Sequence, residues 1–327
     1  MGIYLTPVTT TCRVFAPWKI IRATCWSWRP AFQRRRSARG YLCRLRWPEG
    51  FRCPRCSGTK NWPKGDGLVR CADCDYQVSV TAGTVFQDSH LPLILWFRAV
   101  WWVTSQKNGV SAMGLQRVLG LKSYKTAWTM LHKLRHAMVR PGRDRLQGHV
   151  EVDEAFVGGE EEGVHGRQTE TKAMIAVAVE EDGDGIGRIR MRRIPDASAE
   201  SLMPFIEDSV EPGSLVHTDG WLGYHPLKGK DYRHQITFLK RNSKKASELM
   251  PRVHLAVALL KRWLLGTHQG GVSLAHLDAY LDEFTFRFNR RKSRSRGKLF
   301  YRLLEQAVTV EPLPYRSLVK SPALPPF

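Results

Sequence analysis

The pattern of apolar and polar positions changes character twice along the chain. Residues 41–90 hold only short strand-like pieces among glycines, prolines and cysteines, too little apolar sequence for a core of their own. Residues 91–140 carry apolar positions at helical spacing, which predicts a first helix near 91–106 and two more before Pro141. From residue 149 onward the spacing becomes that of strands alternating with helices.

The second half of the chain predicts a mixed sheet. Strands are expected at 149–157, 171–180, 187–194, 214–218 and 235–239, and helices at 198–210, 251–265 and 273–289. Three hairpin-connected strands followed by crossovers indicate an α/β domain with helices flanking the sheet.

These changes divide the chain into five parts. We expect a poorly ordered N-terminal extension (1–40), a ribbon-like module (41–90), a helical module (91–140), an α/β domain (148–308) and a tail (309–327). The tail is expected to be irregular because five of the chain's prolines follow Glu311.

The charge balance indicates a polyanionic partner. Lys and Arg outnumber Asp and Glu by 51 to 30, which gives a net charge of +21. Such an excess predicts strong, salt-sensitive binding to double-stranded DNA or another nucleic acid. Binding to a membrane surface is the other general interpretation. The longest apolar run, 91–103, is too short to span a bilayer and carries Arg98, so it predicts a buried helix.

Four of the seven cysteines are spaced for zinc. Cys53, Cys56, Cys71 and Cys74 follow the pattern C-x2-C-x14-C-x2-C, in which each pair presents two thiolates on one turn. Paired CxxC motifs indicate structural Zn²⁺ rather than disulfides and favour the reducing cytoplasm as the location. No clean signal peptide precedes them. The motif does not by itself specify a function, because zinc ribbons bind DNA, RNA or protein.

Residues 111–135 have the layout of a helix-turn-helix. Ser111 is an expected N-cap, Gly120 ends the first helix, and Ser123 opens the second. The first helix is expected to turn Leu115, Val118 and Leu119 toward a core. The second offers basic and polar residues to phosphates and base edges, namely Lys122, Tyr124, Lys125, Thr126, Lys133 and Arg135. The alternative is a plain helical hairpin with a solvated basic face.

Two aspartates at predicted strand ends are out of place in so basic a chain. Asp153 and Asp219 each close a strand, and carboxylates facing an anionic ligand indicate a divalent cation between them. Alternation puts Glu151 on the face of Asp153, as a backup ligand, and Glu154 on the other face. The alternative is that each aspartate is an ordinary turn residue.

The predicted helix at 251–265 could complete this site. His254 and Lys261 are seven residues apart and lie on one helix face, while Val257, Leu260 and Leu264 form a strip that packs on the sheet. His254 could bind the cation, although imidazole suits manganese or zinc better than magnesium, and Lys261 could hold a DNA phosphate. The alternative is a structural histidine.

An amphipathic helix near the C-terminus runs into a basic segment. Its phenylalanines, Phe284, Phe286 and Phe288, are expected to pack in a core. Its basic residues, Arg287 and Arg290 to Arg296, are expected to follow a DNA backbone, with Arg290 and Arg291 as the first contacts beyond the phenylalanines.

Taken together, residues 41–308 resemble bacterial insertion-sequence transposases of the ISXO type. The resemblance rests on CPRC…CADC, GVSAMGLQRVLGLKSYKTAW, VEVDEAFVGG, HTDGWLGY and LLKRWLLGTHQG…HLDAYLDEFTFRFNRR, in this order. It implies a ribonuclease-H-like DDE integrase domain with Asp153 as the first catalytic carboxylate and Asp219 as the second.

The third catalytic position departs from the family pattern. Relatives carry Glu or Asn there and a Lys or Arg two turns later. Here the lysine is Lys261, so the third position falls on His254, with Glu248 as the nearest acidic substitute.

The resemblance also implies a mechanism and partners. Two divalent cations, Mg²⁺ or Mn²⁺, roughly 3.5–4 Å apart would support in-line phosphoryl transfer. The substrates would be terminal inverted repeats and target DNA, bound by a homo-oligomer in the bacterial cytoplasm, in association with the nucleoid and without membrane contact.

Three other functions fit parts of the sequence. One is a DNA-binding regulator with an inactive α/β domain, and His254 is the hint of such decay. Another is a structure-selective nuclease of the same fold. A single-domain RNA-binding protein fits least, because the sequence shows no aromatic stacking platform.

Overall fold

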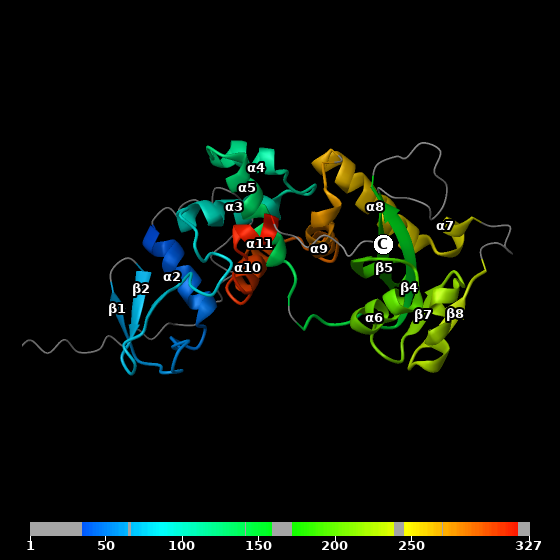
Figure 1. Cartoon of the computed structure of the whole chain (residues 1–327), viewed down its shortest axis with the longest axis horizontal. Helices are drawn as coiled ribbons and strands as arrows, with labels where there is room; N and C mark the ends of the chain where they lie inside the picture. Colours follow the sequence, from blue (N-terminus) through cyan, green and yellow to red (C-terminus); the bar gives the residue numbers. More distant parts are fainter. Residues whose placement is uncertain are drawn as a thin grey trace, which may run out of the picture.

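A computed structural model describes residues 35–64, 67–140, 142–158, 172–238, 245–269 and 271–319 (Figure 1). The predicted N-terminal extension falls outside the described residues except for its last six, and the end of the tail falls outside them as well. Within the described residues, no helix combines the length and apolar character that crossing a membrane requires.

The ribbon is a small antiparallel sheet of β1 (Asn61–Lys64), β2 (Leu68–Cys71) and β3 (Gln77–Ser79). Its own core contains only Phe51, Cys53, Cys71 and Val78 as buried members. So small a core agrees with the expectation that metal binding holds this module together.

A helix that the sequence analysis did not predict precedes the ribbon. Helix α2 (Arg35–Arg46) crosses the boundary expected at residue 40. Its inward residues Tyr41 and Leu42 pack into the core of the helical module rather than into the ribbon. The ribbon is therefore anchored to the helices at its N-terminal end.

The helical module contains α3 (Leu93–Ser105), α4 (Ala112–Leu119) and α5 (Tyr124–His136). Two predicted helix ends are confirmed. The Ser111 side chain accepts a hydrogen bond of 3.0 Å from the Gly114 amide, and Gly120 ends α4 in the left-handed conformation with φ of 64°.

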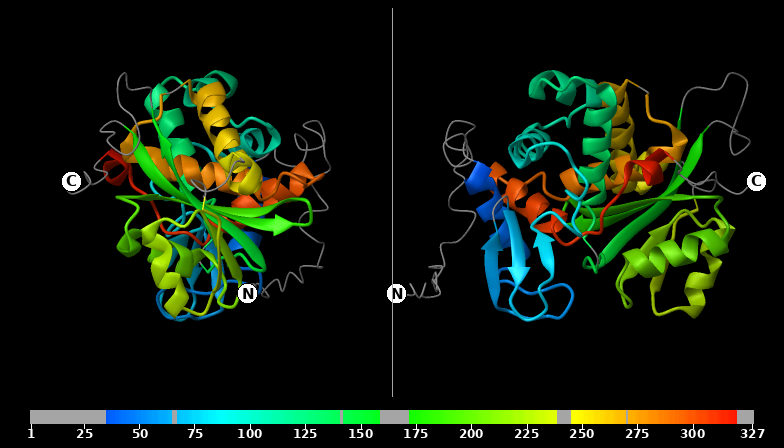
Figure 2. Two further views of the ribbon diagram at one scale, coloured as in Figure 1. Left: turned by 90° about the vertical axis from the view of Figure 1, so that its right-hand side faces the viewer. Right: turned by 60° about the vertical axis from the view of Figure 1, so that its left-hand side comes forward.

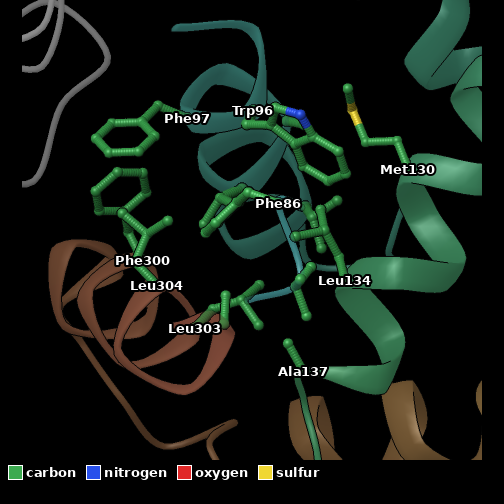
Figure 3. Close-up of a cluster of buried hydrophobic side chains, with 14 of the residues drawn as sticks. Phe86, Trp96, Phe97, Met130, Leu134, Ala137, Phe300, Leu303 and Leu304 are labelled. Carbon is green, nitrogen blue, oxygen red and sulfur yellow. The ribbon is translucent and has the colours of Figure 1, made fainter. Parts of the chain in front are cut away.

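The end of the chain returns to this module. Helix α10 (Arg296–Ala307) inserts Phe300, Leu303 and Leu304 between α3 and α5, so residues expected in the α/β domain complete the helical core (Figure 3). The tail is also less irregular than expected, because α11 (Tyr315–Val319) forms a short helix that contacts α5.

The α/β domain is a five-stranded mixed sheet, as predicted. Its strands are β4 (His149–Val157), β5 (Ala173–Asp182), β6 (Gly185–Ile194), β7 (Leu215–Thr218) and β8 (Arg233–Ile236), in the order β6-β5-β4-β7-β8. The first three pair antiparallel, and β4, β7 and β8 pair parallel. This arrangement is consistent with the ribonuclease-H-like fold, although β5 begins and ends later than expected and β8 begins and ends earlier.

Helices cover both faces of the sheet (Figure 2). The two that cover one face are α8 (Pro251–His268) and α9 (Leu277–Phe288), which the short segments α7 (Ala246–Leu249) and η5 (Leu274–His276) precede. On the other face lie α6 (Ala199–Ser209) and the 3₁₀ segment η3 (Leu222–Gly229). Apolar residues of both faces are therefore buried.

Helix α9 is buried on two sides, which explains its alternating phenylalanines. Phe284 and Phe288 belong to the core under the sheet, whereas Phe286 belongs to the core of the helical module. A helix that faced only one core would not bury residues two apart on its surface. Helix α9 thus joins the helical module to the sheet (Figure 1).

Candidate active site

Adjacent parallel strands bring the two candidate aspartates together. Strand β4 pairs with β7 at Val150–Val216 and Glu151–His217, and the same offset places Asp219, just after β7, beside Asp153. The expectation that Asp153 closes its strand was wrong, because β4 pairs with β5 as far as Val157. The carboxyl ends of neighbouring parallel strands form a common edge, where open α/β sheets place their functional residues. The fold therefore gathers two carboxylates that are far apart in the sequence.

Backbone amides fix the orientation of both carboxylates. Asp153 Oδ1 accepts a hydrogen bond of 2.9 Å from the Glu154 amide, and Asp219 Oδ1 accepts one of 2.9 Å from the Trp221 amide. The turn after Asp219 requires glycine, because Gly220 has φ of 81° and a Cβ there would lie 2.7 Å from Ile236 Cγ2.

A buried tyrosine ties the two segments that carry these aspartates. The Tyr224 hydroxyl, on η3 just after Asp219, donates a hydrogen bond of 2.9 Å to Glu154 Oε2. Burial raises the pKa of Tyr224 well above its usual value, and the carboxylates of Glu154, Asp153 and Asp219 raise it further. Tyr224 therefore remains a neutral donor, and Glu154 acts as its tether on the face away from Asp153.

His254 lies beside Asp153 on the first turn of α8. Its Nε2 is 4.0 Å from Asp153 Oδ2. This nitrogen is buried and has no hydrogen-bond partner among the described residues. Burial lowers the pKa of His254, and the Glu151 carboxylate opposes that shift. The imidazole is thus neutral near pH 7, which is the form that binds a metal ion.

These features suit a divalent cation. Two ligands of one octahedral ion, each at about 2.1 Å, lie roughly 3–4.2 Å apart, so the Asp153–His254 separation is compatible with a shared ion. The ligand atoms of Asp153, Asp219 and His254 do not all lie within 4.8 Å of one another. In the described part of the chain, the four cysteines alone bring three or more potential ligand atoms within 4.8 Å of one another.

The structure gives Glu151 a role other than the expected backup ligand. Its side chain is only 3% exposed, and Oε2 accepts hydrogen bonds from the amides of Arg252 (2.9 Å) and Val253 (2.8 Å) at the start of α8. Arg252 Nη1 lies 3.1 Å from the other oxygen. A carboxylate at this place satisfies unpaired amides and complements the positive end of the helix.

Glu151 therefore connects the strand of Asp153 to the helix of His254. It is two residues from Asp153 and holds the turn of α8 that carries His254. The sequence offered one hint of this helix start in Pro251, a residue favoured at the first helical position. It offered no hint of which carboxylate would cap the helix.

Loss of the negative charge at Glu151 is expected to shift His254 without removing any of the candidate cation ligands. Glu151→Gln should lower any cation-dependent activity about 10- to 100-fold, the range seen when groups that orient metal ligands are lost. Steady-state rates with matched protein concentrations measure this. Glu200→Gln, at an exposed position in the first turn of α6, is the control and should change the rate less than about twofold. Equal rates for the two variants would contradict the positioning role of Glu151.

Lys261 is exposed on α8, two turns beyond His254. The side of α8 that faces the sheet buries Val253, Ala256, Leu260 and Leu264, as the predicted apolar strip requires, while Val257 is only partly buried. The alternative acidic residue, Glu248, is exposed on α7.

The four ribbon cysteines are arranged for tetrahedral zinc. Cys53 Sγ lies 3.7 Å from Cys74 Sγ, and Cys56 Sγ lies 3.6 Å from Cys71 Sγ. With Zn–S bonds of about 2.3 Å, a tetrahedron has sulfur–sulfur edges of about 3.8 Å. A disulfide would need about 2.05 Å. The donor set and spacing thus fit structural Zn²⁺.

Removing one zinc ligand is expected to unfold the ribbon. Cys71→Ser should lower the bound zinc from about one per chain to nearly none, because four thiolates share the ion. Zinc content by atomic absorption and near-UV circular dichroism measure the change. Cys43→Ser, on α2 outside the quartet, should keep the zinc. Full zinc retention by Cys71→Ser would contradict the assignment.

The predicted DNA-contact residues of the helical module divide into two groups. Lys122, Tyr124 and Lys125 are exposed, and the Lys125 ammonium lies 4.0 Å from the centroid of the Tyr315 ring. Lys133 and Arg135 are buried instead and do not face solvent, because this part of α5 is buried on all sides. Lys133 donates to Gln87 O, and Arg135 pairs with Glu283 on α9 at 2.7 Å.

Two further expectations about exposed and buried positions were wrong. Val118 was expected in the core but is 50% exposed. Arg287 was expected on a DNA backbone, yet it lies 2.7 Å from Glu283 and donates to the carbonyls of Gln106 and Val103. The buried carboxylate of Glu283 accounts for the inward position of Arg287.

The arginines at the end of α9 have structural contacts of their own. Arg290 lies over the Phe286 ring at 4.1 Å, and Arg291 lies over the Phe288 ring at 4.0 Å. Both also donate to backbone carbonyls. Their role in DNA binding stays a prediction.

Comparisons with known proteins agree with this architecture. Residues 145–289 match the ISXO2-like transposase domain, and residues 36–77 match the transposase zinc-ribbon domain. A relative described as an uncharacterized protein in the transposable element ISH50 of Halobacterium salinarum is 28% identical over 286 residues. That alignment covers 82% of this chain and 94% of the relative. No solved structure matches the chain significantly. With its zinc-ribbon and ISXO2-like domains in this order, the chain belongs to the insertion-sequence transposases of the ISXO type.

Proposed function

We propose that the chain cleaves DNA strands at the terminal inverted repeats of an insertion sequence and joins them to target DNA. The observation that carries this proposal is the Asp153–His254 pair, to which the pairing of β4 with β7 adds Asp219 as a neighbour. Strand register brings the aspartates together, and the unpartnered His254 Nε2 lies 4.0 Å from Asp153 Oδ2. Such a donor set is unusual in a chain of net charge +21 unless a cation shares it.

Asp153, Asp219 and His254 are the residues that would hold Mg²⁺ or Mn²⁺. When bound, the cation lowers the pKa of a coordinated water and neutralises charge on the phosphodiester. The Glu154 and Trp221 amides keep the two carboxylates oriented, and Glu151 keeps His254 beside them. Lys261 would hold a DNA phosphate through its ammonium group.

The reaction has two in-line displacements. In the first, water attacks a phosphorus at the transposon end, and the departing oxygen becomes a 3′-hydroxyl. In the second, the oxygen of this hydroxyl attacks a phosphorus of the target and forms a new phosphodiester, while the target's own 3′-oxygen leaves that phosphorus and takes up a proton as a 3′-hydroxyl. Neither step needs a covalent link to the protein, since the residues named here would position the DNA and neutralise its phosphate charge rather than attack the phosphorus.

DNA would be delivered by the upstream modules. The zinc ribbon and the exposed residues Lys122, Tyr124 and Lys125 are the proposed contacts with transposon ends, and Arg290 and Arg291 are further proposed contacts. Both transposon ends must meet one target, so the working assembly is proposed to be a homo-oligomer on DNA.

Cleavage of labelled end DNA by the purified protein tests this function. Duplexes that carry the terminal inverted repeats should be nicked at the repeat boundary, with a 3′-hydroxyl product, in Mn²⁺ or Mg²⁺ but not in EDTA. Scrambled repeats should remain intact. A protein that binds the ends without cutting them is a regulator, and one that cuts scrambled duplexes equally is a nuclease; either outcome contradicts the proposal.

The cation preference should depend on His254. Imidazole favours manganese over magnesium, whereas a carboxylate suits both. His254→Glu is therefore expected to raise the ratio of Mg²⁺- to Mn²⁺-supported cleavage at least about fivefold. His90→Glu, at an exposed position outside the α/β domain, is the matched control and should leave the ratio unchanged. An unchanged ratio in His254→Glu would show that this residue does not contact the cation.

A further inference from the structure

A cavity lined by arginines lies where the helical module meets the sheet. Its volume is about 370 Å³, and its walls come from the end of α5, the segment from Arg140 to Asp144, β6, α9 and α10. Six arginines line it, namely Arg140, Arg143, Arg188, Arg190, Arg290 and Arg302. None of the lining residues belongs to the candidate active site.

Three of these arginines have a carboxylate partner. Arg188 pairs with Glu180 at 2.7 Å, Arg302 with Glu305 at 2.7 Å, and Arg140 with Asp144 at 3.2 Å. These pairs neutralise about half of the positive charge around the cavity.

The other three form no ion pair with any described residue. Arg190 is 5% exposed and donates only to the carbonyls of Ile189 and Asp144. Arg290 donates to Phe286 O and stacks on the Phe286 ring. Arg143 has Asp282 as a more distant neighbour. Arg190 is buried, and Arg143 and Arg290 are partly buried. Charges removed from water without a counter-ion destabilise a fold, so this cluster indicates an anion that completes it.

The pKa values of Arg190 and Asp282 also favour a bound anion in the cavity. Burial lowers the pKa of Arg190 to about 10, and repulsion by Arg143 and Arg188 contributes. Burial also raises the pKa of Asp282, the most enclosed acid of the cavity, to about 7 against the effect of Arg143. Near neutral pH this carboxyl carries only part of its charge, so it does little to balance the arginines.

We propose that this cavity binds phosphate groups of the DNA backbone at the junction of the helical module and the α/β domain. The inference rests on the proposed function and adds a contact surface that shares only Arg290 with the DNA contacts named there and is separate from α4–α5 and from the aspartates. Guanidinium groups suit phosphate because each presents a planar fork of donors. The arginines come from both modules, so a bound strand would bridge them.

Salt dependence of DNA binding tests the proposal. Removing one phosphate contact should reduce the slope of log K against log salt by about 1. Arg143→Gln and, separately, Arg290→Gln should each show this reduction with end DNA, together with about tenfold weaker binding at moderate salt. Arg143 lies outside the helices and strands, so its replacement is the least disruptive.

Arg233→Gln is the control, because it removes the same charge from an exposed position on β8, at the opposite edge of the sheet from β6. Zinc content and circular dichroism establish that all three variants are folded. If the slopes for Arg143→Gln and Arg290→Gln equalled that of Arg233→Gln, the inference about the cavity would be overturned. The proposed function would still stand in that case, provided that the wild type binds and cleaves end DNA. Wild-type protein that fails to bind end DNA would instead overturn the function.

A second experiment distinguishes binding of the DNA backbone in this cavity from binding of a small phosphate ligand. Inorganic phosphate is titrated while the melting temperature is recorded for the wild type and Arg143→Gln. Weak stabilisation that end DNA abolishes is expected if the cavity is a backbone site. Saturable stabilisation that is lost in Arg143→Gln while the DNA slope stays unchanged would assign the cavity to a free phosphate ligand and overturn the proposal.

Discussion

Asp153→Asn is expected to lower cation-dependent strand cleavage at least about 1000-fold while DNA binding changes less than about twofold. Metal ions supply several kcal/mol of transition-state stabilisation, and each 1.36 kcal/mol corresponds to a tenfold change in rate. Asparagine keeps the size of the side chain and can still accept the hydrogen bond that the Glu154 amide donates to Oδ1. It loses the charge that would bind the cation.

Asp219→Asn should have the same effect, because the strand register makes the two carboxylates neighbours. Asp231→Asn, an exposed acid just before β8, removes the same charge away from the site and is the matched control. Cleavage is measured on labelled end DNA, and binding by gel shift in EDTA. Retention of cleavage within about tenfold of the wild type in both site variants would remove these residues from the catalytic site.

The second large effect concerns stability. Glu283, on α9, is 1% exposed and lies between Arg135 of α5 and Arg287 of its own helix, at 2.7 Å from each. Removing one partner from such a buried group leaves uncompensated charge and costs about 3–5 kcal/mol. Glu283→Gln is therefore expected to lower the free energy of unfolding by about that amount.

Lowering the pH should produce the same loss of stability gradually. Burial opposes ionisation of Glu283, but Arg287 and Arg135 outweigh it and hold its pKa at about 2. The unfolded value is about 4.3, so the stabilisation is fully present above that pH and is lost as pH falls toward about 2. Glu283→Gln should remove this part of the acid sensitivity.

Urea unfolding monitored by tryptophan fluorescence measures both effects. Asp208→Asn, on α6, breaks an exposed pair with Arg192 of β6 and should cost less than about 1 kcal/mol. If Glu283→Gln were no more destabilising than this control, the buried cluster would not be what joins α5 to α9.

The sequence predicted local features best. Ser111 and Gly120 marked the ends of α4 because capping depends on the residues at the helix end. The cysteine spacing also depends on a short pattern, and the ribbon brings the four thiols together as expected. Asp153 and Asp219 are neighbours because they occupy matching register positions of a parallel pair, Asp153 in the middle of β4 and Asp219 just after β7.

Contacts between distant segments were not predictable in the same way. Lys133, Arg135 and Arg287 are basic in the sequence, and nothing local distinguishes them from surface residues. Their inward direction is explained only by Glu283, whose side chain on α9 is buried against α5 and pairs with both arginines. The same holds for Glu151, whose partners are more than 100 positions away.

For helices α2 and α10, the sequence did not predict which module each helix would join. Both pack into the helical core, although one precedes the ribbon and the other follows the α/β domain. Hydrophobic periodicity identifies an apolar face but does not say which core it enters. Domain boundaries drawn along the sequence therefore divided segments that the fold brings together.

The central claim is that this chain joins DNA ends through the edge of the sheet that carries Asp153 and Asp219. A strand-transfer assay with pre-cleaved end DNA, a target plasmid and Mn²⁺, read by sequencing the junctions, tests it most directly. The account predicts end–target junctions with the wild type and none above background with Asp153→Asn or Asp219→Asn. Junctions formed equally well by these variants, or cleavage by the wild type without any junctions, would contradict it.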